Sequence, residues 1–261
     1  MFSNTICYKI IFFFFLGISI FTHAQYISIS ENYSAQQLVE EVFIGAGQDC
    51  LEVSNVSVSG WIFAEGISYG YFNKENSNFY LDEGIILSTG RANSAVGPNT
   101  SLLSEGPISW GGDQDLEQAL DINNTVNATV LEFDFIAQTN KISFDYVFSS
   151  EQYLTSITSQ AQCNYTDGFA FLLKRVNENE PYQNLAIIPN TDIPVKVNTV
   201  RGEGVCPAAN QQYFGGFNPE QHPTNFNGQT IVMTAQSDII PGELYHIKLV
   251  IADQGNNLYD S

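Results

Sequence analysis

The sequence predicts an all-β domain, a β-sandwich or jelly roll with one short N-terminal helix. Apolar and polar residues alternate in many short runs, which is the period of a half-buried strand. Clusters of Gly, Pro, Asn and Asp separate these runs and are typical of turns. Many strands with almost no helix favour two packed sheets.

The one helix is expected from Ser34 to about Phe43. Ser34 and Gln37 form a capping-box pattern, in which each side chain accepts a bond from the backbone N–H of the other residue. Leu38 and Val39 begin an apolar face at helical spacing. We therefore expect this helix to pack on a sheet.

The strands follow from alternation, and we expect about ten of them. Those that the pattern defines lie at 51–58, 84–89, 130–135, 142–149, 169–173, 185–188, 231–235 and 244–252. The alternation slips by one residue at Asn55 and Val56, which predicts a bulge. The connection from Pro189 to Gly228 is long and rich in Gly and Asn, so we expect it to be functional or mobile.

The first 24 residues are typical of a signal peptide. They contain Lys9, no acidic residue, and an apolar run from Ile10 to Phe21 that is shorter than the roughly 20 residues needed to span a bilayer. Thr22 and Ala24 fit the cleavage-site pattern, so we expect cleavage after Ala24. The remaining 25–261 would be one secreted domain, with no membrane insertion after cleavage.

The charge balance excludes one class of partner. The chain has 28 acidic and 9 basic residues, a net charge of -19, and no basic run. Nucleic acid is bound by clustered Lys and Arg, so we exclude it as a partner. The acidity is typical of an exported protein that binds divalent cations, or of a solvated acidic surface alone.

The cysteines predict one disulfide. Cys7 would leave with the signal peptide, so Cys50, Cys163 and Cys206 remain in an oxidising compartment. We expect Cys163 to pair with Cys206 because both lie in polar, turn-rich stretches. Cys50 would then be buried and reduced, or paired with something outside this chain.

Eight stretches together resemble one protein family. They are Gly84–Gly90, Gly97–Asn99, Trp110–Leu116, Leu131–Phe135, Phe148–Tyr153, Asp167–Phe171, Asn225–Thr230 and Tyr245–Asp253. In their order and spacing they are similar to the choice-of-anchor L domain of exported proteins from Bacteroidota and other bacteria. The resemblance implies a surface or secreted module that precedes one of several C-terminal anchoring or sorting segments, often the type IX secretion signal. It implies no biochemical activity.

The end of the chain departs from that family pattern. Family members continue into another strand, whereas this sequence stops at Ser261. We therefore expect a domain that is cut before its last strand.

Four carboxylates follow or precede expected strands and predict a calcium site. They are Glu151, Asp167, Asp253 and Asp260. Calcium takes six to eight oxygen ligands, and loops at one end of a sandwich can supply them. Crowded carboxylates repel one another unless a cation or protons compensate. The alternative is that each carboxylate caps a turn or accepts a backbone hydrogen bond.

A second acidic group, Asp113, Asp115 and Glu117, has the alternating spacing of a calcium loop. It lacks the sixth-position glycine and the terminal Glu of an EF-hand. We expect Asp113 to cap a short helical turn that runs through Ala119, with metal or ligand contact as the alternative.

Aromatic residues in the loops are the candidate ligand surface. Those closest to the glycines of the long connection are Tyr213, Phe214, Phe217 and Phe226, with Tyr153 and Tyr165 nearby in other loops. Sugar rings stack on exposed aromatic faces, and loops on a rigid scaffold are where such sites occur. The alternative is that these rings hold the connection against the sandwich.

The sequence thus predicts a noncatalytic surface module for adhesion or for binding an extracellular glycan or surface protein, with calcium as its cofactor. One alternative is a carbohydrate-active hydrolase that uses Glu151 and Asp167, which would need to lie about 5 to 10 Å apart in a cleft. Another is a structural spacer with buried loop aromatics. His222 and His246 have no metal-ligand spacing.

Overall fold

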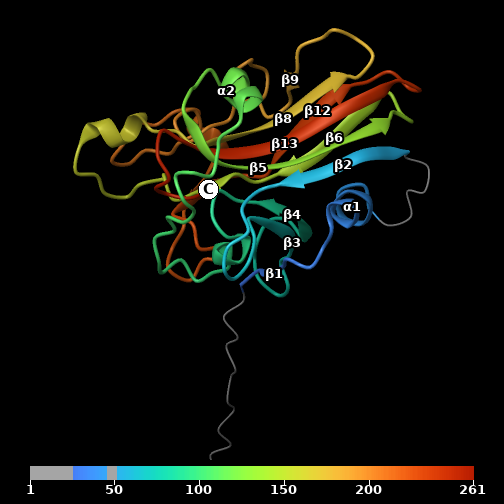
Figure 1. The fold of residues 1–261 in the computed structure, drawn as a ribbon. Coiled ribbons are helices and arrows are strands. Elements are labelled where there is room, and N and C mark those ends of the chain that lie inside the picture. Colours follow the sequence, from blue (N-terminus) through green and yellow to red (C-terminus); the bar gives the residue numbers. More distant parts are fainter. Residues whose placement is uncertain (1–25, 46–51) are drawn as a thin grey trace, which may run out of the picture.

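The computed structural model describes residues 26–45 and 52–261, in which antiparallel strands dominate and helices are few and short (Figure 1). The all-β prediction is confirmed. The expected signal peptide and Cys50 lie outside the described residues.

One large sheet forms the centre of the fold. Its order is β2 (Val53–Ser59), β5 (Thr125–Ile136), β13 (Leu244–Gln254), β8 (Gly168–Arg175) and β9 (Gln183–Asn184), and every pair is antiparallel. The central strand β13 pairs with β5 on one edge and with β8 on the other. Its backbone groups are therefore satisfied on both sides over most of its length.

Smaller sheets make a second layer. They are β6 (Lys141–Tyr146) with β12 (Met233–Asp238); β7 (Ser149–Ser150) with β11 (Gly228–Thr230) and β10 (Phe214–Phe217); and β1 (Ser28–Ser30), β3 (Tyr69–Asn73) and β4 (Glu83–Leu87). The main core lies between this layer and the large sheet. Phe133, Phe169 and Ile247 of the large sheet are buried there with Tyr146 and Met233 of the second layer.

The helix α2 (Gln114–Leu120) covers the other face of the large sheet (Figure 1). Its Leu116 and Leu120 pack against small and aliphatic side chains of β5, β8 and β13. Because both faces are covered, β5 is buried at most positions and does not show simple alternation. The predicted cap is confirmed, since Asp113 Oδ1 accepts a 2.9 Å bond from the Leu116 N–H.

The N-terminal helix lies where it was predicted. The capping box is present, because Ser34 Oγ accepts from the Gln37 N–H and Gln37 Oε1 accepts from the Ser34 N–H. The helix begins as α1 (Ala35–Gln37) and continues as a π-helix, η1 (Leu38–Phe43). Leu38 and Val39 are fully buried in the main core.

The strand predictions are mostly confirmed, with particular exceptions. The bulge in β2 is present, since Asn55 has φ 52° and the register with β5 shifts between Ser54 and Ser57. Residues 185–188 were predicted as a strand. They instead follow the short β9 and form local backbone hydrogen bonds with residues 193–195. Strands β1, β3, β9, β10 and β11 were not predicted.

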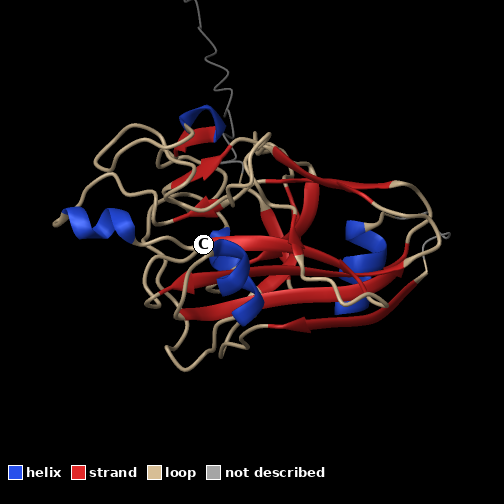
Figure 2. Ribbon diagram, turned by 90° about the horizontal axis from the view of Figure 1, so that it is seen from above, coloured by secondary structure: helices blue, strands red, loops and turns tan. Residues whose placement is uncertain are grey.

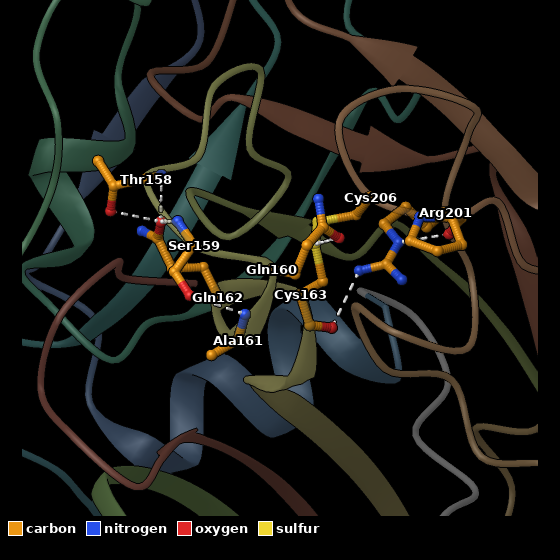
Figure 3. Close-up of a disulfide and its surroundings, with 9 residues drawn as sticks. Thr158, Ser159, Gln160, Ala161, Gln162, Cys163, Arg201 and Cys206 are labelled. Atoms are coloured by element: carbon orange, nitrogen blue, oxygen red, sulfur yellow. Dashed lines mark hydrogen bonds between the residues drawn. A yellow bond between two sulfur atoms is a disulfide. The ribbon is translucent and has the colours of Figure 1, made fainter.

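The long connection 189–228 is structured. It contains a turn of 3-10 helix, η4 (Gln211–Tyr213), and the strand β10. The predicted disulfide joins Cys206 of this connection to Cys163 of η3 (Gln160–Asn164), with 5.6 Å between the Cα atoms (Figure 3). Beside the disulfide, the Arg201 guanidinium donates hydrogen bonds to the carbonyl oxygens of Cys163 and Pro207, one from each loop. The disulfide and Arg201 therefore hold the two loops together.

Removing the disulfide is expected to lower the free energy of unfolding by about 2 to 4 kcal/mol, because the unfolded chain gains loop entropy. The test is urea denaturation of the parent and of the Cys163→Ser/Cys206→Ser variant, each with and without reductant. Reductant should lower the midpoint of the parent to that of the variant and leave the variant unchanged. A parent that is indifferent to reductant and matches the variant would contradict this.

Candidate functional site

The four predicted carboxylates, here called the carboxylate cluster, are brought together from separate parts of the chain. Glu151 directly follows β7, Asp167 directly precedes β8, Asp253 lies in β13, and Asp260 lies near the end of the chain. All four are buried, with exposed fractions of 1% or less. The site is thus inside the fold and not on a surface rim.

Strand register sets the closest relation within the cluster. Ala252 of β13 pairs with Gly168 of β8 in an antiparallel ladder, so the next residues, Asp253 and Asp167, lie at the same end of neighbouring strands. Like charges at facing positions of a sheet are destabilising. Burial first, and then the charge of Asp167, raise the pKa of Asp253 well above its ordinary value.

Both carboxylate oxygens of Asp167 accept hydrogen bonds. Its Oδ1 accepts from Gln152 Nε2 at 2.9 Å and from the Gln254 N–H at 3.0 Å. Its Oδ2 accepts from the Ser261 hydroxyl at 3.0 Å. Burial nevertheless raises the pKa of Asp167 well above its ordinary value, and the charge of Asp260 adds to this.

Asp260 and Glu151 form the other half of the cluster. Asp260 accepts from the Glu105 N–H at 2.9 Å, and Glu151 accepts from the Leu103 N–H at 3.0 Å through Oε1. Burial raises the pKa of each to about 7. The charge of Asp260 adds to the rise at Glu151, and that of Glu105 adds to the rise at Asp260.

Asp253 is the least satisfied member. Neither of its carboxylate oxygens has a hydrogen-bond partner, and Oε2 of Glu151 also lacks one. The nearby Thr89 hydroxyl lowers the pKa of Asp253 and so opposes part of the rise caused by burial. Its contact with the carboxylate does not have the geometry of a hydrogen bond. A buried carboxylate with unpaired oxygens is costly, so Asp253 must be protonated or must meet a positive charge.

Within the described part of the chain, no side-chain cation forms an ion pair with the cluster. None of the ion pairs among the described residues includes a cluster member. Arg91 lowers the pKa of Asp260 in part, but its guanidinium is paired with Glu105. Within residues 26–45 and 52–261, no three Asp, Glu, His or Cys side chains form a ready-made metal-binding group. Protons or an external cation must therefore supply the compensating charge.

The sequence reasoning missed the residues that support this cluster. Gly90 leaves room for Asp260, because a Cβ at this position would collide with its carboxylate. Ser261 donates its hydroxyl proton to Asp167, and the same oxygen lies 2.8 Å from the Ser150 hydroxyl, from which it can accept. The run that ends in Gly90 could have signalled a close approach, whereas nothing in the sequence pointed to Ser261.

The second acidic group meets a side-chain cation. Lys248 Nζ lies 2.6 Å from Asp113 Oδ2 and 2.7 Å from Asp115 Oδ2, and Lys248 is buried. Glu117 instead accepts from the Thr125 N–H at 2.7 Å. The positive charge that a metal would supply here comes from Lys248.

The predicted ligand aromatics are largely packed. Phe226 is 4% exposed and lies in a small core with Ala95 and Leu103. Tyr213, Phe214 and Phe217 are half-buried against the main core. The Phe214 ring lies 5.0 Å from that of Phe217 and 5.0 Å from that of Tyr153. These contacts hold the long connection down and leave only part of each ring free.

The carboxyl pair of the hydrolase alternative and the two predicted histidines are the remaining candidates. Glu151 and Asp167 are 1% and 0% exposed, so a sugar would not reach this carboxyl pair in the structure. His246 Nδ1 lies 2.6 Å from Asp134 Oδ1. His222 Nδ1 lies 3.0 Å from the Thr224 hydroxyl.

A family model described as the Choice-of-anchor L domain matches residues 26–261, which is the described domain almost end to end. No curated protein and no solved structure matches the chain. In the part of the chain that the structure describes, no helix has the length and apolar character to cross a bilayer.

The raised pKa values predict that stability falls as pH rises. A carboxyl group whose pKa is higher in the folded than in the unfolded state contributes stability at low pH and loses it as pH passes through the folded value. For Glu151 and Asp260 that value is about 7, against 4.5 and 3.8 ordinarily. In excess chelator, the melting temperature should therefore drop between pH about 5 and about 8.

Circular dichroism melts across this range, in chelator, provide the measurement. The Glu151→Gln variant removes one titrating group and should show a shallower drop than the parent. A melting temperature that is constant or rises over the range would contradict the prediction.

Proposed function

The chain belongs to the choice-of-anchor L domain family, which marks a surface or secreted module. We propose that it is a noncatalytic extracellular module that is stabilised by a calcium ion bound inside the fold. The ligands in this proposal are the members of the carboxylate cluster, Glu151, Asp167, Asp253 and Asp260.

The observation that carries the proposal is the state of Asp253. Its carboxylate is fully buried, both oxygens lack partners, and it lies beside Asp167 and Asp260 without a side-chain cation. A buried charge that is left without its partner typically lowers the stability of a protein by about 3 to 5 kcal/mol. A cation at this position would therefore stabilise the folded state at neutral pH. The free Oε2 of Glu151 offers one more oxygen.

Calcium suits this donor set better than other common metals. The cluster offers carboxylate oxygens, with the hydroxyls of Thr89 and Ser261 close by, and neither sulfur nor imidazole. Oxygen ligands select hard cations, and calcium accepts irregular geometry where magnesium requires a near-ideal octahedron. Binding would draw the free oxygens of Asp253 and Glu151 toward one centre.

The proposed role toward partners is adhesion, or binding of an extracellular glycan or surface protein, through the exposed parts of Tyr213, Phe214 and Phe217. The packing of these rings gives this role less support than the cluster gives to calcium. The spacer alternative is favoured by the same packing, because the rings anchor the connection. The identity of the partner therefore stays a prediction.

Calcium is expected to raise the melting temperature. With a Kd of ~0.1 mM, in the range of extracellular modules, about 1 mM calcium adds about 1.4 kcal/mol of stability. For a domain of this size that is a rise of roughly 3 to 6 °C. Melts at neutral pH in calcium, in magnesium and in chelator measure it. No difference between calcium and chelator would overturn the calcium proposal.

The Asp253→Asn variant separates a cation ligand from a structural carboxylate. The amide has nearly the same shape without the charge, so in chelator the variant should be at least as stable as the parent, while its response to calcium should be lost. Asp192→Asn, on an exposed loop, is the matched control and should respond to calcium as the parent does. An equal loss of stability for Asp253→Asn in both buffers would indicate a purely structural role.

A further inference from the structure

A hollow on the surface of the domain lies outside the carboxylate cluster. It has a volume of about 360 Å³ and is open to solvent. Phe63, Glu65, Arg91, Glu105 and Gly106 line it. Hollows of this size are typical of small-molecule sites, which combine apolar walls with a few polar groups.

The hollow belongs to the loop-rich end of the domain. The Glu105 N–H donates to the Asp260 carboxylate at 2.9 Å, so the hollow lies beside the end of the chain. In both views the C mark lies where the strands of the large sheet give way to loops (Figure 1, Figure 2). Loops on a rigid scaffold are where binding sites are concentrated.

The wall that Gly106 forms is held in place from behind. Gly106 has φ 83°, and a Cβ here would lie 2.8 Å from the Asn127 amide nitrogen and 2.9 Å from the Trp110 ring. The carbonyl oxygen of Gly106 accepts from Asn257 Nδ2 at 2.8 Å. The carbonyl oxygen of Pro107 accepts from Asn127 Nδ2 at 3.1 Å. The loop is thus fixed before a ligand arrives, which lowers the entropy lost on binding.

Arg91 presents oriented hydrogen-bond donors to the hollow. Its Nε donates to both carboxylate oxygens of Glu105, at 3.0 and 3.1 Å, and its Nη2 donates to Oε1 of the same group. These bonds hold the guanidinium by one side, and no described residue accepts a hydrogen bond from Nη1. The side chain is 41% exposed, so Nη1 can donate to a ligand.

Phe63 supplies an apolar surface next to these donors. Its ring centre lies 6.0 Å from the guanidinium carbon of Arg91 and 6.2 Å from the ring of the buried Trp110, edge to face. Trp110 Nε1 donates to the Ala128 carbonyl oxygen at 2.8 Å, which fixes the ring behind Phe63. Phe63 is half-buried, so part of its ring remains at the hollow. An apolar ring face and oriented N–H donors therefore lie within the reach of one sugar ring.

The charges around Arg91 select against an anion. Hydrogen bonding to Glu105 first, and then the charges of Glu105, Glu65 and Glu31, raise the pKa of Arg91. Three carboxylates therefore surround one guanidinium, in a chain whose net charge is -19. An acidic sugar would be repelled, whereas hydroxyl groups can accept from Arg91 and donate to the exposed Glu65.

We propose that this hollow, here called the Phe63 hollow, binds one ring of an uncharged saccharide. The apolar face of the sugar stacks on Phe63, while its hydroxyls accept hydrogen bonds from Arg91 and donate to Glu65. A purely apolar ligand would leave the donors of Arg91 unmet, and an acidic ligand would face the three carboxylates.

The Phe63 hollow is separate from the surfaces proposed above. Its lining includes no member of the carboxylate cluster and no ring of the long connection. The inference rests on the proposed extracellular binding role, and it moves that role to the Phe63 hollow. It does not depend on calcium, because none of the lining carboxylates is a proposed calcium ligand.

The test is binding of the purified protein, in chelator, to a printed array of oligosaccharides. The array includes uncharged members and members that carry uronic or sialic acids. The uncharged oligosaccharide with the strongest signal is then titrated by calorimetry into the parent and into the hollow variants Phe63→Leu, Arg91→Lys and Glu65→Gln. Tyr80→Leu is the matched control, because this ring is 53% exposed and lies outside the hollow.

Uncharged oligosaccharides should bind, and acidic ones should give little signal. Phe63→Leu and Arg91→Lys should each weaken binding by about tenfold, because one removes the stacking ring and the other removes Nη1. Glu65→Gln should weaken it by about threefold, since an amide oxygen is a weaker acceptor than a carboxylate. Tyr80→Leu should bind as the parent does.

Melting temperatures show whether each variant is folded. Glu65 lies on an exposed turn, so Glu65→Gln still tests the hollow if either of the other two variants is unstable.

Three outcomes would overturn the proposal: no uncharged oligosaccharide binds, acidic oligosaccharides bind best, or binding is the same in the folded hollow variants as in the parent. In the third case, Tyr213→Leu shows which proposal fails. If that variant loses binding, the binding role proposed above stands at the long connection, and the Phe63 hollow is not its site.

Discussion

The antiparallel ladder of β13 is the constraint on which the rest of the fold depends. Its pairing with β5 and β8 extends over most of its length, so its register decides what meets at its end. At that end the register brings Asp253 of β13 beside Asp167, where two carboxylates share a dry environment. A one-residue shift of this register would separate the two carboxylates, but it would also turn the apolar side chains of β13 out of the core. The repulsion of one charged pair is too small to offset that loss.

Asp260 and Ser261 connect the carboxylate cluster to both layers of the fold. Backbone and hydroxyl groups of these residues bond Glu151, Thr89 and Asp167, which connects both layers of the fold at one point. The proposed cation would lie at this connection, because Asp260 is one of its proposed ligands.

This arrangement suits a module that functions outside the cell. The family to which the chain belongs marks a surface or secreted protein. The disulfide between Cys163 and Cys206 holds the long connection to the rest of the fold, and half-buried aromatic rings do the same along it. The interior of such a domain is organised by covalent and charged contacts as well as by its apolar core.

Local features could be predicted from the sequence: the capping box at Ser34, the bulge at Asn55, the cap at Asp113, and the strands whose two faces differ. It also indicated the cysteine pair and the four carboxylates, because their positions relative to strands can be read along the chain. Each of these depends on neighbours within a few residues or on composition. They could therefore be predicted without knowing which strands pair.

Only the tertiary structure decided what those residues meet. The burial of Phe226, the pairing of Lys248 with Asp113 and Asp115, and the unpaired oxygens of Asp253 all depend on strand order and register. Strand order is set by the summed burial of the whole core, and short alternating runs do not specify their partners. The sequence could therefore name the carboxylates of the cluster, and the fold alone could bring them together.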